Sequence, residues 1–403
     1  MIRQEYILIS LVGLAMLVYF LLATPVMMDD GFHYQGFAES LVRGMIDFKS
    51  FYGFQGLSIL SAPVFWLTGS NISIIITSAI LYLLALPLAY FIGRDFYGNN
   101  RAGVYFMALI LLMPYPYTTM MRGFQEAALL FFILLVICGA VNKKFWTPHL
   151  NNEVKNAKGN RYLSAGWTPL AWAIGGIVKP FALVLFPLFA RDFLPRSFLS
   201  RSDLIKIIWV LATLAVGAVY LGISYYQTGH LVNNAAINSY QGNFNTGNPP
   251  PLVESFTVGA KGFLRVGANL LLHYRKILLS PLAIVLGGLA LIKFKELKLR
   301  REIILAILLN IILVGSLTFS FSKYLLPMVV LLALASINYF LKYKWLIFLV
   351  LADSIFVFLP IWDYFGHVFW SNIYIYLMPL WLAVVLFIIQ NVKFKNQNNN
   401  IKF

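Results

Sequence analysis

The stretch Asp29-Asp30-Gly31-Phe32-His33-Tyr34 directly follows residues 8–28, which contain no charged residue. A helix needs about 20 apolar residues to cross a bilayer, so we interpret residues 5–28 as a first, retained membrane-spanning helix. Carboxylates are costly inside hydrocarbon, so Asp29 and Asp30 should lie at the water boundary where that helix ends. A carboxylate pair at this place either serves metal ligation, acid–base chemistry or cation coupling, or only marks the boundary.

The composition indicates an integral membrane protein. Of the 403 residues, 60% are hydrophobic and 11% are charged, and the mean hydropathy is +0.78, which excludes an ordinary soluble domain. The net charge of +16 comes from basic residues between apolar runs, so the positive-inside rule explains it better than nucleic-acid binding does. Cys138 is the only cysteine, which excludes a disulfide framework and a cysteine metal site.

The apolar runs predict an all-α protein with about twelve membrane crossings. The basic loops at 143–161 and 293–301 should both be cytoplasmic, so an even number of crossings must separate them. Residues 165–194 therefore cross zero or two times. Their centre, Gly175-Gly176-Ile177-Val178-Lys179-Pro180, predicts two half-spans that meet with Lys179 on the outer side. The other predicted crossings are residues 72–93, 102–119, 124–141, 204–226, 278–292, 303–320, 324–341, 345–360 and 373–389.

This topology makes residues 1–403 a single polytopic domain with both termini in the cytoplasm. Residues 57–69 are too short for a comfortable crossing, so we expect them to be re-entrant or interfacial. A competing topology makes 57–69 a full span and 165–194 a single one, but it places the basic loop at 143–161 outside the cell. We favour the first topology, because it keeps both basic loops on one side.

Two outer segments differ from the spans. In the first outer loop, residues 29–56, apolar and polar residues alternate with helical spacing, which predicts a short amphipathic helix within 31–49 that lies on the membrane surface or packs on the spans. Its apolar side is Phe37, Leu41, Met45 and Phe48, and its polar side is Gln35, Glu39, Arg43 and Asp47. The long outer loop at 227–276 is rich in turn residues, so we expect it to be irregular.

The outer face collects scarce charged residues in this topology, namely Asp29, Asp30, Arg122, Lys179 and Lys323. Transfer from a phosphate-bearing lipid needs this combination. One carboxylate removes a proton from the acceptor hydroxyl or amide, and the cations neutralise the departing phosphate.

Two further residues belong to this outer set. Glu126 lies one helical turn after Arg122, so the two side chains could form a structural ion pair on one face. His33 is a lone histidine, which is more typical of a polar residue at the interface than of a metal ligand. No Walker loop, His-Glu-x-x-His or Gly-x-Ser-x-Gly motif is present, and we assign no residue to a metal site.

The residues from Asp29 to Tyr34, with Ala38, Leu41 and Gly44 after them, resemble the first outer loop of the glycosyltransferase C superfamily. The most similar branch contains the protein O-mannosyltransferases and the lipid A aminoarabinose transferases. Shorter similarities extend to about residue 340. They are residues 62–69, residues 94–103, Arg122-x-x-x-Glu126, Lys179-Pro180 and Lys323-Tyr324-Leu325-Leu326-Pro327.

This resemblance implies a many-span fold in the plasma membrane and an inverting transfer at the outer face. The sugar donor would be a polyprenyl phosphate or diphosphate of the dolichyl or undecaprenyl type, and the acceptor a protein, lipid or glycan. Asp30, or Asp29 as a close rival, would be the general base. The substrate- and phosphate-binding residues would be drawn from Arg122, Lys179, Lys323, Tyr324, Glu126 and His33.

The chain departs from this family pattern at two places. Residues 52–56 replace a His/Lys-Pro-Pro sequence that would supply a donor contact, and Lys323 stands where arginine is commoner, so bidentate phosphate binding is lost there. The metal dependence stays open. Two adjacent carboxylates could hold a divalent cation with water completing its shell, or act without one.

Two other functions compete with the transferase. A transporter or flippase for a lipid-linked or anionic substrate would use the same cations, but it predicts charged or Gly/Pro-broken sites in matching halves of the chain. Only residues 175–180 fit that description. A non-catalytic membrane scaffold would make the acidic pair incidental. Replacing Asp29 and Asp30 together separates these functions, because an enzyme loses turnover and a scaffold keeps its partners.

Overall fold

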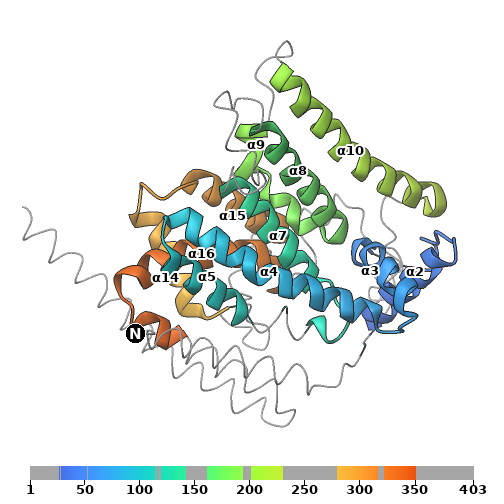
Figure 1. Cartoon of the computed structure of the whole chain (residues 1–403), viewed down its shortest axis with the longest axis horizontal. Coiled ribbons are helices and arrows are strands. Elements are labelled where there is room, and N and C mark those ends of the chain that lie inside the picture. The colour runs from blue at the N-terminus through green and yellow to red at the C-terminus, as the bar shows by residue number, and fades with distance from the viewer. Residues whose placement is uncertain are drawn as a thin grey trace, which may run out of the picture.

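The computed structural model describes residues 27, 29–51, 53–113, 116, 119–141, 161–193, 201–229, 279–315 and 322–350, and within them every regular element is helical. The first predicted span, the basic loop up to residue 160, nearly all of the long outer loop and residues 351–403 lie outside this part. The elements are α2 (Asp29–Val42), α3 (Gly56–Thr68), α4 (Ser73–Tyr97), α5 (Asn100–Leu111), α7 (Glu126–Val141), α8 (Arg161–Val178), the 3₁₀ helix η1 (Pro180–Leu185), α9 (Pro187–Phe193), α10 (Arg201–Thr228), α14 (Pro281–Lys293), α15 (Arg300–Gly315), the 3₁₀ helix η4 (Ser322–Leu325) and α16 (Leu326–Lys342) (Figure 1).

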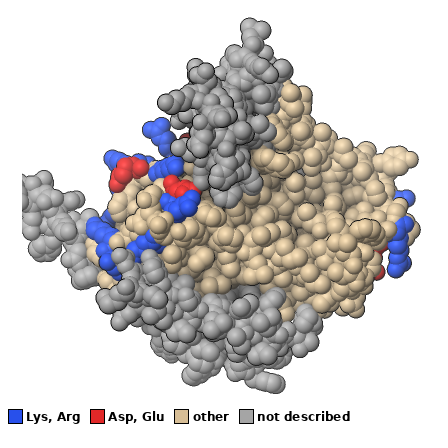
Figure 2. Space-filling view, in the orientation of Figure 1, with Lys and Arg blue, Asp and Glu red and all other residues tan. Residues whose placement is uncertain are grey.

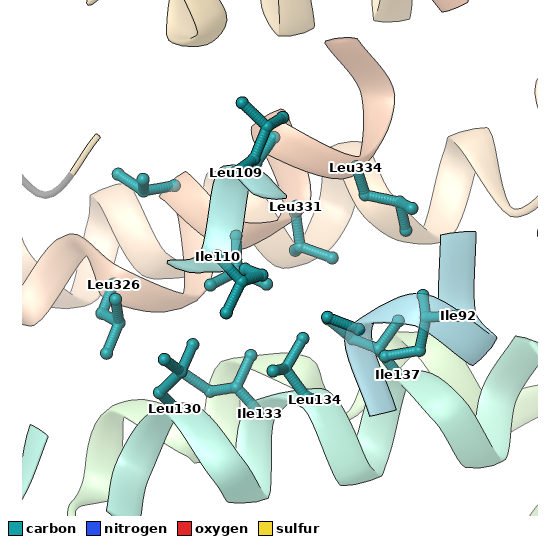
Figure 3. Packing of buried hydrophobic residues seen from close by; sticks show 14 of the residues in the cluster. Ile92, Leu109, Ile110, Leu130, Ile133, Leu134, Ile137, Leu326, Leu331 and Leu334 are labelled. Carbon is teal, nitrogen blue, oxygen red and sulfur yellow. The ribbon is translucent and has the colours of Figure 1, made fainter. Parts of the chain in front are cut away.

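The core lies where α4, α5, α7 and α16 meet. Figure 3 shows the leucine and isoleucine side chains that these four helices direct toward one another. α7 is apolar on all sides and nearly every one of its residues is buried, as expected of a helix surrounded by others. The backbones of α14 and α16 approach each other closely at Gly287, where a Cβ would collide with the carbonyl of Leu332. Small residues allow such close helix packing.

Two helices in the described part are long and apolar enough to cross a membrane, namely α4 and residues Ile207–Thr228 of α10. α10 packs on its neighbours through one side only, and the opposite side exposes large apolar side chains, among them Ile208, Leu211, Leu214 and Val219. The other predicted spans in the described part appear as shorter helices. The all-helical class is therefore confirmed, and twelve crossings stay a prediction.

The predicted break in residues 165–194 is present. α8 ends at Val178, Lys179 is extended with φ −160°, and η1 begins at Pro180. The chain then folds back along α8, because the Nε1–H of Trp172 donates to the carbonyl of Leu183 at 3.0 Å. Pro180 at the first position of η1 explains this reversal. It has no N–H to continue the hydrogen bonds of α8, and it disfavours helical backbone angles at the preceding residue, Lys179.

Proline also shortens another predicted span. The apolar run at 102–119 appears as α5, which ends at Leu111, shortly before Pro114 and Pro116. α3 has 13 residues and ends at Gly69, whose N–H bonds to the carbonyl of Phe65. It is therefore about 20 Å long, too short to cross 30 Å of hydrocarbon.

The helix in the first outer loop differs from the prediction. It begins at Asp29 and ends at Val42, because Gly44 adopts the left-handed region with φ +77° and turns the chain. The assigned faces hold only in part, since Phe37 is 1% exposed as expected, whereas Gln35 is only 4% exposed and Met45 is 54% exposed. Phe48 is buried without being helical, because it packs between Phe37 and Tyr220.

Candidate functional site

The start of α2 lies directly against the turn that precedes α7. A Cβ at Gly31 would lie 2.5 Å from the carbonyl oxygen of Arg122 and 3.2 Å from the Cα of Gly123. Only glycine allows two backbones to approach this closely. Asp30, which is half-buried, directly precedes Gly31. The contact therefore places Asp30 next to the turn that carries Arg122.

Lys179 and Glu126 form a buried ion pair next to this turn. Lys179 Nζ lies 2.6 Å from Glu126 Oε1, and the side chains are 12% and 1% exposed. Glu126 is the first residue of α7, where the helix dipole favours a negative charge, and Lys179 occupies the break between α8 and η1. An ion pair this buried loses much of its attraction to desolvation, so stability alone is a weak reason for its presence.

Tyr324 also lies against Lys179. Its ring stacks on Phe181 with centroids 4.3 Å apart, and Lys179 Nζ lies 5.7 Å from the ring centroid, within the range of a cation–π interaction. The carbonyl of Tyr324 accepts a hydrogen bond of 3.1 Å from Asn310, which is fully buried. Asn310 is not among the predicted residues, and its only sequence signal is an amide inside an apolar run.

Residues 53–56 lie between the residue before α7 and the end of α8. A Cβ at Gly56 would collide with the backbone of Val178, the residue before Lys179. Gln125 Nε2 donates to the carbonyl of Phe54, and the backbone N–H of Gln55 donates to the hydroxyl of Tyr220 at 2.7 Å. This segment therefore contributes backbone contacts that fix the site rather than a charged side chain.

Gln35 joins α2 to the start of α4. Its amide nitrogen donates to Glu39 at 3.1 Å and to the carbonyl of Ser70 at 3.4 Å, while its amide oxygen accepts from Ser73 Oγ at 3.0 Å and from the N–H of Ile74 at 3.3 Å. The helical spacing assigned Gln35 to the exposed face, so sequence reasoning missed this role.

The other predicted site residues are placed as follows. Asp29 is the first residue of α2 and Lys323 lies in η4, and the side chains of both are outside the described part. Arg122 is exposed in the turn before α7, so it does not share a helix face with Glu126, whose observed partner is Lys179. His33 is half-buried and meets the ring of Phe51 edge-on, with centroids 6.4 Å apart.

No group of three or more His, Cys, Asp or Glu side chains that could hold a metal ion occurs among the residues that the structure describes. The Asp29 carboxylate is outside that set. After the end of α2, hydrogen bonds from the hydroxyl and N–H of Ser50 and from the N–H of Lys49 hold the pKa of Asp47 below its ordinary value. Asp47 thus stabilises the turn that follows α2.

The segments predicted for the cytoplasmic side meet at the other end of the molecule. Lys298 Nζ donates to the carbonyl of Val141 at 3.2 Å, and Phe294 packs on Tyr339. α4 joins this end to the end that holds α2 (Figure 1). On the face in Figure 2, charged side chains gather at these two ends, and the described surface between them carries none.

No protein-family model, no curated protein and no solved structure matches this chain. The resemblance of residues 29–44 to the glycosyltransferase C loop therefore stays a prediction. What the structure adds is proximity, since the start of α2, the turn at Arg122, the Glu126–Lys179 pair and Tyr324 lie together.

Proposed function

We propose that this protein is a multi-pass membrane glycosyltransferase, which moves a sugar from a polyprenyl-phosphate carrier to a protein, lipid or glycan acceptor. The observation that carries the proposal is that segments from distant parts of the chain, which carry one carboxylate and two cations, lie next to one another. Asp30 is the second residue of α2, and Arg122 lies in the turn against the start of that helix. Glu126, four residues after Arg122, pairs with Lys179.

The proposed reaction is a single inverting displacement. Asp30, or Asp29 beside it, takes the proton from the acceptor group, and the acceptor oxygen or nitrogen attacks the anomeric carbon. The bond from that carbon to the phosphate oxygen breaks, and the electron pair leaves with the carrier phosphate. In this proposal Arg122, Lys179 and Lys323 neutralise the negative charge on that phosphate. A divalent cation held by Asp29 and Asp30 would also help to neutralise the charge of the departing phosphate.

The two ends of the molecule support a membrane location with the site outside the cell. α4 has 25 residues and is therefore about 37 Å long, enough to cross the hydrocarbon core. The end near Lys298 is strongly basic, and basic segments stay in the cytoplasm. The opposite end, with Asp30 and Lys179, would then face outward in the plasma membrane.

The first experiment measures sugar transfer by the purified protein in nanodiscs from radiolabelled polyprenyl-phosphate sugars, with a membrane or protein extract as acceptor. We expect transfer by the wild type and loss of transfer in Asp30→Asn or Asp29→Asn, with the carrier still bound. The same assay on the wild type with EDTA tests the metal dependence. Transfer that stops with EDTA indicates a metal-assisted reaction, and transfer that continues indicates a metal-free one. Transfer that persists in both Asn variants would contradict the proposed base.

A second pair of variants separates phosphate binding from structure at Lys179. Removing only Lys179 leaves a buried carboxylate and should cost about 3–5 kcal/mol of stability. The double variant Lys179→Met with Glu126→Leu removes both charges and should unfold close to the wild-type temperature. If Lys179 contacts the phosphate, this stable double variant loses transfer. A double variant that keeps full transfer would show a purely structural pair.

A transporter or flippase is the second candidate, and the break between α8 and η1 favours it. Interrupted helices with a buried ion pair occur where transporters bind substrate, and Lys179 lies at such an interruption. Reconstituted vesicles distinguish the two functions. A flippase moves a fluorescent polyprenyl phosphate between leaflets without any acceptor, whereas a transferase leaves the carrier in its leaflet and consumes the sugar.

A further inference from the structure

The end of the molecule opposite Asp30 carries a concentration of positive charge. The loop from α14 to α15 and the end of α16 contain seven basic residues and two acidic ones. We call this group the basic end. Its cations are Lys293, Lys295, Lys298, Arg300, Arg301, Lys342 and Lys344, and its carboxylates are Glu296 and Glu302.

The basic end is a folded surface. Phe294 packs on Tyr339 with ring centroids 5.5 Å apart, which joins the α14–α15 loop to the end of α16. Arg300 Nε donates to the carbonyl of Leu291 at 2.5 Å, and Lys298 donates to the last residue of α7. These bonds hold the loop in place, while Lys293, Lys295 and Lys344 stay exposed.

Large apolar side chains are exposed beside these cations. Ile292 is 70% exposed and precedes Lys293, while Trp345 is 42% exposed and follows Lys344. Phe348, one turn further, is 40% exposed. Tryptophan next to lysine at the end of an apolar helix is typical of the membrane–water interface, where the ring lies at the level of the headgroups.

We propose that the basic end binds anionic phospholipid headgroups of the membrane leaflet that it faces. The ammonium and guanidinium groups would contact the lipid phosphates, and Ile292, Trp345 and Phe348 would enter the adjoining acyl boundary. The apolar side chains favour a lipid over free phosphate, which has no acyl chain for them to contact. At the opposite end, the exposed Arg43 and Lys49 lie close in sequence to Glu39 and Asp47, and Arg43 pairs with Glu39.

The test uses the full-length protein in detergent, titrated with phosphatidylglycerol or phosphatidylcholine, and counts bound lipids by native mass spectrometry. We expect phosphatidylglycerol to bind more tightly, and the preference to weaken with salt. The variant Lys293→Gln, Lys295→Gln, Lys344→Gln should lose about fivefold in phosphatidylglycerol affinity for each removed charge. The replaced side chains are exposed, and gel filtration with circular dichroism checks that the variant stays folded.

The matched control is Arg43→Gln with Lys49→Gln, which removes two exposed cations from the opposite end and should leave lipid binding unchanged. Equal affinity for the two lipids, or an equal loss in the control, would overturn the proposal. Displacement of phosphatidylglycerol by millimolar inorganic phosphate would show a phosphate site instead of a lipid site. None of these outcomes depends on sugar transfer, so the proposed function stands or falls separately.

Discussion

At the scale of single residues, the position of Asp30 depends on a glycine. Alanine in place of glycine inside a helix normally stabilises it by about 1 kcal/mol. At Gly31 the added methyl would lie 2.5 Å from the carbonyl of Arg122, a backbone atom that cannot rotate away. The two effects have opposite signs, so the substitution reports on the contact between α2 and the turn before α7.

We predict that Gly31→Ala destabilises the protein by about 1–3 kcal/mol through overpacking. It should also lower sugar transfer by about 100-fold, because a shift of about 1 Å at a catalytic group has that effect. The control is Gly36→Ala, whose methyl would meet only the end of the Phe51 side chain. Thermal unfolding in detergent and the transfer assay measure both, and equal behaviour of the two variants would contradict the contact.

Asp47 provides a pH-dependent prediction. Its folded-state pKa is lowered chiefly by hydrogen bonds from Ser50, so its contribution to the turn is complete above the ordinary carboxyl range and disappears as the pH falls through the lowered value. Ser50→Ala should shift the titration of Asp47 upward, toward its ordinary pKa. Carbon-13 NMR of labelled aspartate follows this titration, and an unchanged midpoint in Ser50→Ala would refute the assignment.

At the scale of elements, the sequence predicts what depends on local pattern and misses what depends on distant contacts. The apolar runs correctly indicated α4, α7 and α10, and Pro180 marked the break between α8 and η1. The end of α2 was misjudged, because apolar spacing continued past the turn that Gly44 imposes. Gln35 and Asn310 were missed for another reason, since their partners lie on other helices and no spacing within one helix reveals them.

α2 should loosen when Gln35 is replaced. Gln35→Met keeps the side-chain volume but leaves the Ser73 hydroxyl and the Ile74 N–H without their acceptor, which should cost about 1–3 kcal/mol. Hydrogen exchange should rise across residues 29–42 and stay unchanged in α16. Arg43→Gln is the control, because it removes the ion pair with Glu39, worth at most about 1 kcal/mol, and leaves the hydrogen bonds of Gln35 in place. Unchanged exchange in α2 would show that Gln35 does not anchor the helix.

At the scale of the whole molecule, the two charged ends predict the orientation in the membrane. Cys138 is fully buried, so the wild type should not react with maleimides. In intact cells, a membrane-impermeant maleimide should label the Lys49→Cys variant. The Lys344→Cys variant should be labelled only after the cells are permeabilised. Labelling of both variants in intact cells would place the two ends on one side and contradict the topology.

The glycine contacts at residues 31 and 56 also bear on how this protein could be engineered. Main-chain atoms join α2 to the turn at Arg122, and other main-chain atoms join residue 56 to the end of α8. The relative placement of Asp30 and Lys179 is therefore tolerant of most side-chain changes elsewhere. A saturation library should show strict intolerance at these two positions, and other positions could be varied without moving Asp30 relative to Lys179.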